Sequence, residues 1–498
     1  MKKFFLWIAL MISFQVSYAQ DFISGRILEN SLQNKTTPLQ GANILWEGTT
    51  IGTTSDENGY FELKYISSRK LIVSFIGYKK LILDADKIKN TNMEIILVPE
   101  ANELDKVEIT GTKSSIQLDY LGVENVQRIT EKELMKAACC NLSESFETNP
   151  SIDVSFTDAV SGAKQIEMLG LSGIYTQTTM ENLPYLRGLF SSQGLTFIPG
   201  TWMHSINVSK GTGSVANGYE SITGQIDIEM QKPAEIDGKP FYLNLYSDYD
   251  RRFEGNLNFR PEISDNFSMI TMLHGSMRDH QSDINNDGFT DMPNFKTINL
   301  MQRWFYYNQS GLESRFGFQF LKDKKIGGTL EHGASSSNHF PYENNNELIN
   351  LYMKTGYIFE NENAQSLGLQ LNYIDYKNKS VFGFRNYSGT QQSFYANLLF
   401  QSQFLEEHII RVGLSLQNEN FSEELSSMKF ERVESVPGAF IEFTYKPIDD
   451  LSIVSGIRGD YHNSYGFFLT PRIHVRYSVT DDLIFRAALG KGYRTANI

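Results

Sequence analysis

The second half of the chain alternates apolar and polar residues with a period of two, and this feature limits the fold more than any other. Phe253 and Leu257 fall on one side of a strand, whereas Glu254 and Asn256 fall on the other. Roughly thirteen such segments follow one another over residues 236–498, each long enough to cross a bilayer as a tilted strand. The pattern is typical of strands with two different environments, so we expect a large antiparallel sheet.

The expected connections between these segments differ in length on the two sides of the sheet. Short turns such as residues 308–311 alternate with long polar loops, expected at residues 278–296, 322–347, 377–392 and 418–434. Short periplasmic turns opposite long extracellular loops are typical of an outer-membrane β-barrel. A barrel that encloses an inner domain needs about 22 strands. We therefore expect only part of a barrel and a truncated product.

Residues 1–19 have the order of a secretory signal peptide. Two lysines follow Met1, an apolar run comes next, and small residues end at Ala19. This order predicts export and cleavage before Gln20. Beyond it, no apolar stretch has the length of a membrane-spanning helix. The formal net charge of -13 lacks the basic character of a nucleic-acid-binding protein.

Residues 20–99 alternate short apolar strands with turn residues, a pattern that predicts a small β-sandwich. Asn58 and Gly59 stand where a hairpin needs positive φ. The segments Pro38-Leu39-Gln40-Gly41-Ala42-Asn43-Ile44 and Ser74-Phe75-Ile76-Gly77-Tyr78 resemble the carboxypeptidase-regulatory-like domain that precedes outer-membrane receptors of the Bacteroidetes type. The resemblance implies no hydrolase activity for this domain.

Residues 100–115 contain a β-prone segment between two expected domains. An exposed strand can join the sheet of a partner by β-augmentation. The segment resembles the TonB box, which implies the periplasmic protein TonB as a partner; an ordinary linker strand is the alternative. Its residues are Leu104, Asp105, Lys106, Val107, Glu108, Ile109 and Thr110.

Residues 116–235 resemble the plug domain of TonB-dependent transporters. Thr130, followed by Glu133, predicts the start of a helix. Residues 205–228 then give a strand, a glycine-rich turn and a second strand in the order of that family. Glu181-Asn182 departs from the Asp-Gly that is more usual in the family. We expect an α+β plug. Because Glu181-Asn182 departs from the family pattern, the class of solute that the protein binds stays open.

Together these segments predict a mainly β protein with a β-sandwich, a plug and part of a transmembrane β-barrel. The resemblance implies energy-coupled import of a scarce solute across the outer membrane of a Gram-negative bacterium, most often an iron siderophore or a metal chelate. Motifs of P-loop, zinc-protease or serine-hydrolase type are missing from the sequence, and we expect no enzyme and no required cofactor. Two alternatives are an adhesin or assembly platform, and a receptor that captures polymers with a surface lipoprotein.

One expected extracellular loop places side-chain oxygens at alternate positions. With Gly288 at the sixth position, it resembles the first half of a calcium loop. Asn294 replaces the Glu of an EF-hand at the twelfth position, so we expect either a structural Ca²⁺ in a different geometry or a plain polar turn. The candidate ligands are Asp283, Asn285, Asp287, Phe289 and Asp291.

The expected plug also carries residues that suit a soft ion such as Cu(I). Methionines on apolar strands more often fill a core, so copper import is an alternative function. The candidate ligands are Cys139, Cys140, Met168, Met180, Met203 and His204.

Overall fold

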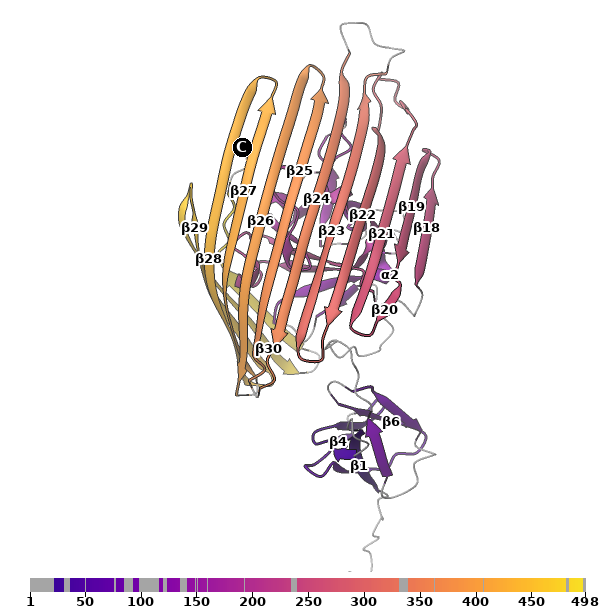
Figure 1. Ribbon diagram of the computed structural model, residues 1–498, viewed down its shortest axis with the longest axis vertical. Coiled ribbons are helices and arrows are strands. Elements are labelled where there is room, and N and C mark those ends of the chain that lie inside the picture. Colours follow the sequence, from indigo (N-terminus) through magenta and orange to yellow (C-terminus); the bar gives the residue numbers. More distant parts are fainter. Residues whose placement is uncertain are drawn as a thin grey trace, which may run out of the picture. The chain divides into compact units, whose positions relative to one another are not determined.

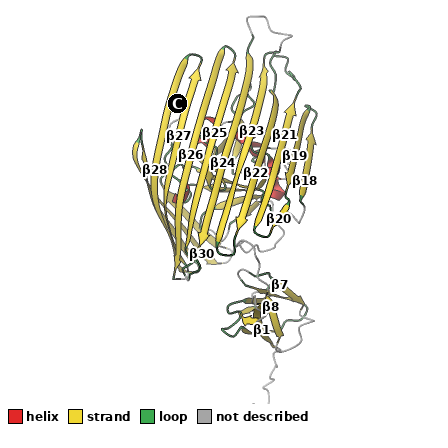
Figure 2. Cartoon of the chain, viewed as in Figure 1, coloured by secondary structure: helices red, strands yellow, loops and turns green. Residues whose placement is uncertain are grey.

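The computed structural model is mainly β, as predicted, and divides into two compact units, residues 1–111 and 112–498 (Figure 2). None of the helices in the described part of the chain is long and apolar enough to cross a membrane. The structure describes residues 22–30, 36–49, 51–75, 78–84, 93–97, 116–119, 123–134, 141–147, 149, 151–158, 160–191, 193–233, 240–330, 339–361, 363–405, 407–480 and 483–495.

The first unit is a β-sandwich, as predicted. In one sheet, β1 pairs with β2 and β5 in antiparallel and with β8 in parallel, and the other sheet has the order β4-β3-β6-β7. Both sheets bury apolar side chains between them, including Ile27 and Trp46, and the Trp46 indole donates to the Lys64 carbonyl at 2.8 Å. The strands are β1 Phe22–Asn30, β2 Thr36–Pro38, β3 Asn43–Trp46, β4 Gly52–Thr54, β5 Tyr60–Lys64, β6 Lys70–Ser74, β7 Leu81–Asp84 and β8 Met93–Leu97.

The plug belongs to the second unit and is built around a six-stranded sheet of order β15-β14-β17-β16-β10-β9. A three-stranded sheet, β11-β12-β13, and two short helices complete it. The helix expected after Thr130 is confirmed, since α2 spans Glu131–Leu134. The other elements are α3 Leu142–Ser145, β9 Ile116–Leu118, β10 Val126–Thr130, β11 Asp153–Phe156, β12 Lys164–Met168, β13 Leu171–Ser172, β14 Thr176–Met180, β15 Leu183–Pro184, β16 Met203–Lys210 and β17 Gly224–Met230.

The rest of this unit is a curved antiparallel sheet of 14 strands, which we call the barrel sheet (Figure 1). Strands β18 to β31 follow one another in sequence order, with the short β20 paired to β21 alone. The predicted truncation is untested and stays a prediction. The strands are β18 Phe241–Ser247, β19 Arg252–Phe259, β20 Glu262–Ser264, β21 Phe267–Arg278, β22 Asn294–Tyr307, β23 Leu312–Gly328, β24 Pro341–Ile358, β25 Ser366–Phe382, β26 Arg385–Phe404, β27 His408–Leu425, β28 Met428–Ile448, β29 Leu451–His462, β30 Gly466–Thr480 and β31 Leu483–Gly490.

Three of the four expected long loops were wrong in extent. Residues 377–392 and 418–434 are mostly strand and contain only tight turns at 383–384 and 426–427. The loop expected at residues 322–347 is shorter in the structure, where the connection covers only residues 329–340. The error arises because these strands continue past the apolar band with polar side chains on both faces, which resembles a loop in sequence.

The two faces of the barrel sheet differ in chemistry. Outward side chains such as Leu351, Leu398 and Leu414 are apolar and exposed, whereas inward amides such as Asn346 and Asn350 are buried. The plug lies behind the sheet in Figure 1 and covers this inner face. An apolar outer face opposite a polar lumen is the arrangement of a transmembrane barrel.

Candidate functional site at the plug–barrel interface

The plug and the barrel sheet share one apolar core. Phe190 and Phe197 of the plug lie against the ring of Tyr376 on β25, with ring centroids 5.3 and 6.4 Å apart. Met301 and Leu348, on the inner face of the sheet, belong to the same cluster of buried residues. The plug is therefore packed directly against the wall, and ion pairs between described residues join the plug to barrel strands at three places.

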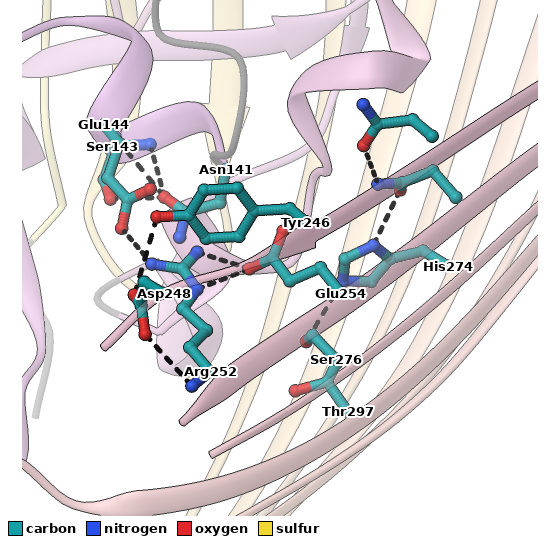
Figure 3. Close-up of polar contacts among 12 residues, drawn as sticks. Asn141, Ser143, Glu144, Tyr246, Asp248, Arg252, Glu254, His274, Ser276 and Thr297 are labelled. Carbon is teal, nitrogen blue, oxygen red and sulfur yellow. Dashed lines mark hydrogen bonds and ion pairs between the residues drawn. The ribbon is translucent and has the colours of Figure 1, made fainter. Parts of the chain in front are cut away.

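The first charged contact joins helix α3 to the edge of the barrel sheet (Figure 3). Asn141 caps the helix by accepting from the amides of Ser143 and Glu144, at 3.1 and 3.3 Å. Capping fixes the Glu144 carboxylate, which accepts from Arg252 of β19 at 3.2 Å. Arg252 also contacts Glu254 at 2.5 Å. A barrel arginine is thus shared between plug and wall.

The second contact centres on Glu181 at the turn between β14 and β15. Arg303 of β22 pairs with this carboxylate, and both side chains are buried. Lys354 of β24 donates to the Glu181 carbonyl at 3.0 Å. Burial opposes ionisation of Glu181, but the field of Arg303 outweighs it and holds its pKa below the usual range.

The same turn explains how the chain accommodates its departure from Asp-Gly. Glu181 and Asn182 both have positive φ, 51° and 63°, a conformation that side chains other than Gly adopt at a cost. Asp227 compensates by accepting from the Asn182 amide at 2.7 Å and from the Thr179 hydroxyl at 2.6 Å. Burial nevertheless raises the pKa of Asp227.

The third contact surrounds Arg187 of the plug. This guanidinium lies 3.1 Å from Glu220 of the plug and 2.9 Å from Glu419 of β27. Arg494, beyond the last strand, reaches Glu220 at 2.9 Å. Burial opposes ionisation of Glu220, yet the two arginines keep its pKa low. Both carboxylates of this network, Glu220 of the plug and Glu419 of the wall, thus have an arginine partner.

Two small gaps lie between plug and wall beside these contacts. Met180, Met230 and Met301 line one gap, with Arg303 and Asn372 among its polar groups. The lining of the other includes Gln177, Tyr219, Glu220 and Arg458. Each gap has room for about one water molecule, which is far below the size of a small-molecule site.

Glu124 contributes a titratable group where the plug begins. It lies before β10, facing Glu442 of β28 and Arg472 of β30. Burial raises the pKa of Glu124 to about 7, the nearby Glu442 adds to the rise, and Arg472 opposes it. Its charge therefore changes within the neutral pH range.

The predicted TonB box, the signal peptide and the Cys139-Cys140 pair lie outside the described residues. Met168 and Met203 are buried in the core cluster near opposite ends of β17, about 20 Å apart along a strand of this length. They do not share one site. Met180 lines the first cavity, and His204 is half-buried.

Within the candidate calcium loop, the acidic side chains accept hydrogen bonds from the backbone. Asp283 accepts from the amides of Asp287 and Gly288, both at 3.0 Å, and Asp291 accepts from Ile284 at 2.9 Å. Among the described residues, no group of three or more His, Cys, Asp or Glu is placed to hold a metal ion. Calcium binding stays a prediction.

Sequence reasoning missed the charged contacts and two of the three cavity methionines, Met230 and Met301. Arg303, Glu419 and Met301 lie on inward positions of barrel strands. Charged residues at inward positions of an alternating strand could have predicted the ion pairs. Such charges are buried when a domain fills the lumen, and buried charges need partners of opposite sign.

A domain packed against the polar inner face of an outwardly apolar antiparallel sheet defines the class of plugged transmembrane barrels. The chain belongs to the TonB-dependent receptor family: the profile "TonB dependent receptor-like, beta-barrel" matches residues 209–498. "TonB-dependent Receptor Plug Domain" matches residues 122–225 and "CarboxypepD_reg-like domain" residues 23–109. This is a family of outer-membrane receptors and not of enzymes, so the resemblance stated from the sequence is confirmed.

Individual relatives are distant. TonB-dependent receptor SusC of Bacteroides thetaiotaomicron is 30% identical over 148 residues, which cover 29% of this chain and 14% of SusC. The siderophore receptor PirA from Acinetobacter baumannii has a TM-score of 0.60 at 16% identity, covering 75% of this chain and 61% of PirA. The copper transporter OprC has a TM-score of 0.58 at 12% identity, covering 73% of this chain and 64% of OprC. The chain thus spans less than two thirds of these relatives, and the two structural matches concern the fold alone.

Proposed function

We propose that the protein imports a scarce solute, a siderophore or metal chelate, by energy-coupled displacement of the plug. The observation that carries the proposal is the packing of the six-stranded plug sheet against the barrel wall through discrete ion pairs, such as Arg303 with Glu181. The solute binds on the extracellular side of plug and barrel. TonB captures residues 104–110 as an added strand and transmits the force.

A proline in the coupling segment tests this mechanism. Proline cannot donate a ladder hydrogen bond, so Ile109→Pro in the full-length gene abolishes uptake while solute binding persists. Ile109→Val, which keeps both the backbone donor and the β propensity, is the matched control. Uptake that survives Ile109→Pro contradicts energy coupling through this segment. An adhesin would keep its adhesion in both variants and show no uptake in either.

The solute class is tested by growth of a deletion strain under separate iron, copper and cobalamin limitation. A siderophore or chelate importer loses growth under iron limitation alone. The full-length gene restores it, and Ile109→Pro does not. A neighbouring surface lipoprotein gene would support the polymer-capturing alternative.

Copper import is the second candidate, and the methionine-lined cavity is the observation that favours it. Thioethers are soft ligands that suit Cu(I), and Met180, Met230 and Met301 line one space. Copper retained by the purified protein, and lost in Met301→Leu and Cys139→Ser but not in Met272→Leu, would support it. No retained copper in the unmodified protein would remove it.

Export and the calcium loop are proposed on the sequence. The mature protein begins at Gln20, which N-terminal sequencing of the outer-membrane fraction tests. The loop around Asp283 binds Ca²⁺ as a structural ion, and calorimetric titration without heat at millimolar Ca²⁺ would exclude it.

A further inference from the structure

The first segment of the plug follows residues 104–110 in the sequence and is held at two points. β9 lies at the edge of the plug sheet, next to β10. Directly after β9, the Asp119 carbonyl accepts from Arg486 of β31 at 2.7 Å. Further along, the carboxyl group of Glu124 accepts from the amide of Ser214, which belongs to the plug turn between β16 and β17. Because of this chain order, a pull on residues 104–110 acts on these two contacts first.

The turn that contains Ser214 is itself bound to the barrel wall. Glu442 of β28 accepts from the Ser214 hydroxyl at 2.6 Å and from the Val215 amide at 3.3 Å. Arg472 of β30 donates to the Ser214 carbonyl at 2.9 Å. Two carboxyl groups, Glu124 from the plug and Glu442 from the wall, therefore approach the same turn. We call the meeting of Glu124, Ser214 and Glu442 the latch.

The two carboxyl groups of the latch differ in their partners. Glu442 forms an ion pair with Arg411 of β27 at 3.1 Å. Glu124 forms no ion pair with any residue that the structure describes. When Glu124 is ionised, it is therefore a second negative charge beside Glu442, and like charges that share a site favour protonation of one of them. Burial and the nearby Glu442 accordingly raise the pKa of Glu124 to about 7.

Charged side chains of the neighbouring strands also face the latch. Arg458 of β29 donates to the backbone of the same turn at 3.3 Å, and Arg472 and His474 of β30 lie close to Glu442. Arginines keep their charge throughout the physiological pH range, so His474 and the two carboxyl groups are the members of this cluster whose charge can change. A variant of Glu124 therefore has to be compared directly with the unmodified protein.

We propose that Glu124 is a proton-dependent positioning residue that holds the start of the plug against the barrel wall. In the protonated form, its carboxyl group adds a hydrogen-bond donor beside the Glu442 carboxylate, and the latch stays closed. In the ionised form it repels Glu442, and the start of the plug separates from the wall more easily. The role under tension rests on the proposed function, in which force reaches the plug through residues 104–110.

Hydrogen exchange of the purified full chain in detergent, from pH 5 to pH 8, tests the latch. Peptides that cover residues 123–130 and 211–218 report its opening, after correction for the intrinsic exchange rate at each pH. The docked carboxyl group of Glu124 binds a proton more tightly than the undocked one, so opening increases with pH by up to about tenfold per unit below pH 7 and levels off above it. Glu124→Gln, which cannot ionise, removes this dependence.

Two further variants separate charge from folding. Glu442→Gln removes the neighbouring negative charge, so the pH at which opening levels off moves to a lower value, which a merely structural role of Glu124 would not produce. Asp153→Asn removes an exposed carboxylate of β11, outside the latch, and keeps the pH profile of the unmodified protein. Equal exchange of β25 in all four proteins shows that the barrel sheet is intact.

Three results would overturn the proposal: an unchanged pH dependence in Glu124→Gln, protection of residues 211–218 that increases with pH, or identical profiles of Glu442→Gln and the unmodified protein. The exchange measurement needs neither TonB nor a solute. Uptake that survives Ile109→Pro would therefore refute energy coupling and leave the pH profile of the latch standing, whereas a flat profile with uptake lost in Ile109→Pro would refute the latch alone.

Discussion

The β-sandwich and the barrel sheet use the same period-two alternation in opposite senses. The sandwich buries Ile27 and Trp46 and exposes charged residues such as Glu62. In contrast, the barrel sheet exposes Leu351 and buries Asn346. The alternation fixes only that a strand has two environments. The solvent on the outer side, water or lipid, decides which face of the strand is apolar. Four predictions follow from this difference between the sandwich and the barrel sheet.

The largest effect is expected in the sandwich core. Trp46→Ala leaves a cavity in a packed apolar interior and lowers the free energy of unfolding of this unit by about 3 to 5 kcal/mol. Trp46→Phe, which keeps most of the volume but loses the bond to the Lys64 carbonyl, costs less. Thermal unfolding followed by circular dichroism measures the stability of both variants. Equal losses of stability in the two would contradict the view that the volume of the Trp46 side chain stabilises the core.

The barrel interior depends on charge pairing instead. Arg303→Met leaves the Glu181 carboxylate buried without its partner and destabilises plug docking by about 3 kcal/mol. The double variant Arg303→Met/Glu181→Gln recovers most of this loss. Hydrogen exchange of the plug amides in detergent measures the change, and a double variant as unstable as the single one would refute the pairing argument.

A matched pair of exposed residues sharpens the comparison of solvents. Leu351 on the outer face is 47% exposed and Ile82 in the sandwich is 50% exposed. Leu351→Arg places a charge in lipid and costs about 2 to 3 kcal/mol, whereas Ile82→Arg changes stability by less than about 0.5 kcal/mol. Denaturant titration in lipid vesicles compares the two, and equal effects would show that Leu351 does not face lipid.

The smallest effect concerns pH. The carboxyl of Glu124 has a raised pKa of about 7 in the folded protein, against 4.5 ordinarily, so the folded state binds more protons between these values. Stability therefore falls as pH rises through this window. Glu124→Gln removes the dependence and is more stable than the unmodified protein at pH 8, with no difference at pH 4. Thermal unfolding from pH 4 to pH 8 measures the difference in stability between the two proteins. A difference that stays constant with pH would contradict the role of Glu124.

Much of the fold followed from local sequence signals. Alternation predicted the sheet, and Thr130 followed by Glu133 predicted the start of α2. The extent of β25 and β27 was missed, because their distal halves are polar on both faces and hydropathy alone does not distinguish such strands from loops.

The site was less accessible to sequence reasoning. Arg303 meets Glu181 across 122 positions of sequence, and pairing at that distance depends on the docking of plug and wall. The sequence grouped Met168 with Met203 because both lie in the plug, yet β17 separates them.

The amide-rich inner wall has a mechanical consequence. Nine buried asparagines, Asn256, Asn258, Asn299, Asn344, Asn346, Asn350, Asn372, Asn378 and Asn397, line the barrel sheet from β19 to β26. Each presents both a donor and an acceptor, so the inner wall can be satisfied by neutral hydrogen bonds, both within the sheet and to the plug. Of the nine, Asn258, Asn299 and Asn372 donate to plug carbonyl oxygens. The three ion pairs between plug and wall have no neutral replacement of this kind, so they fix the position of the plug in this structure.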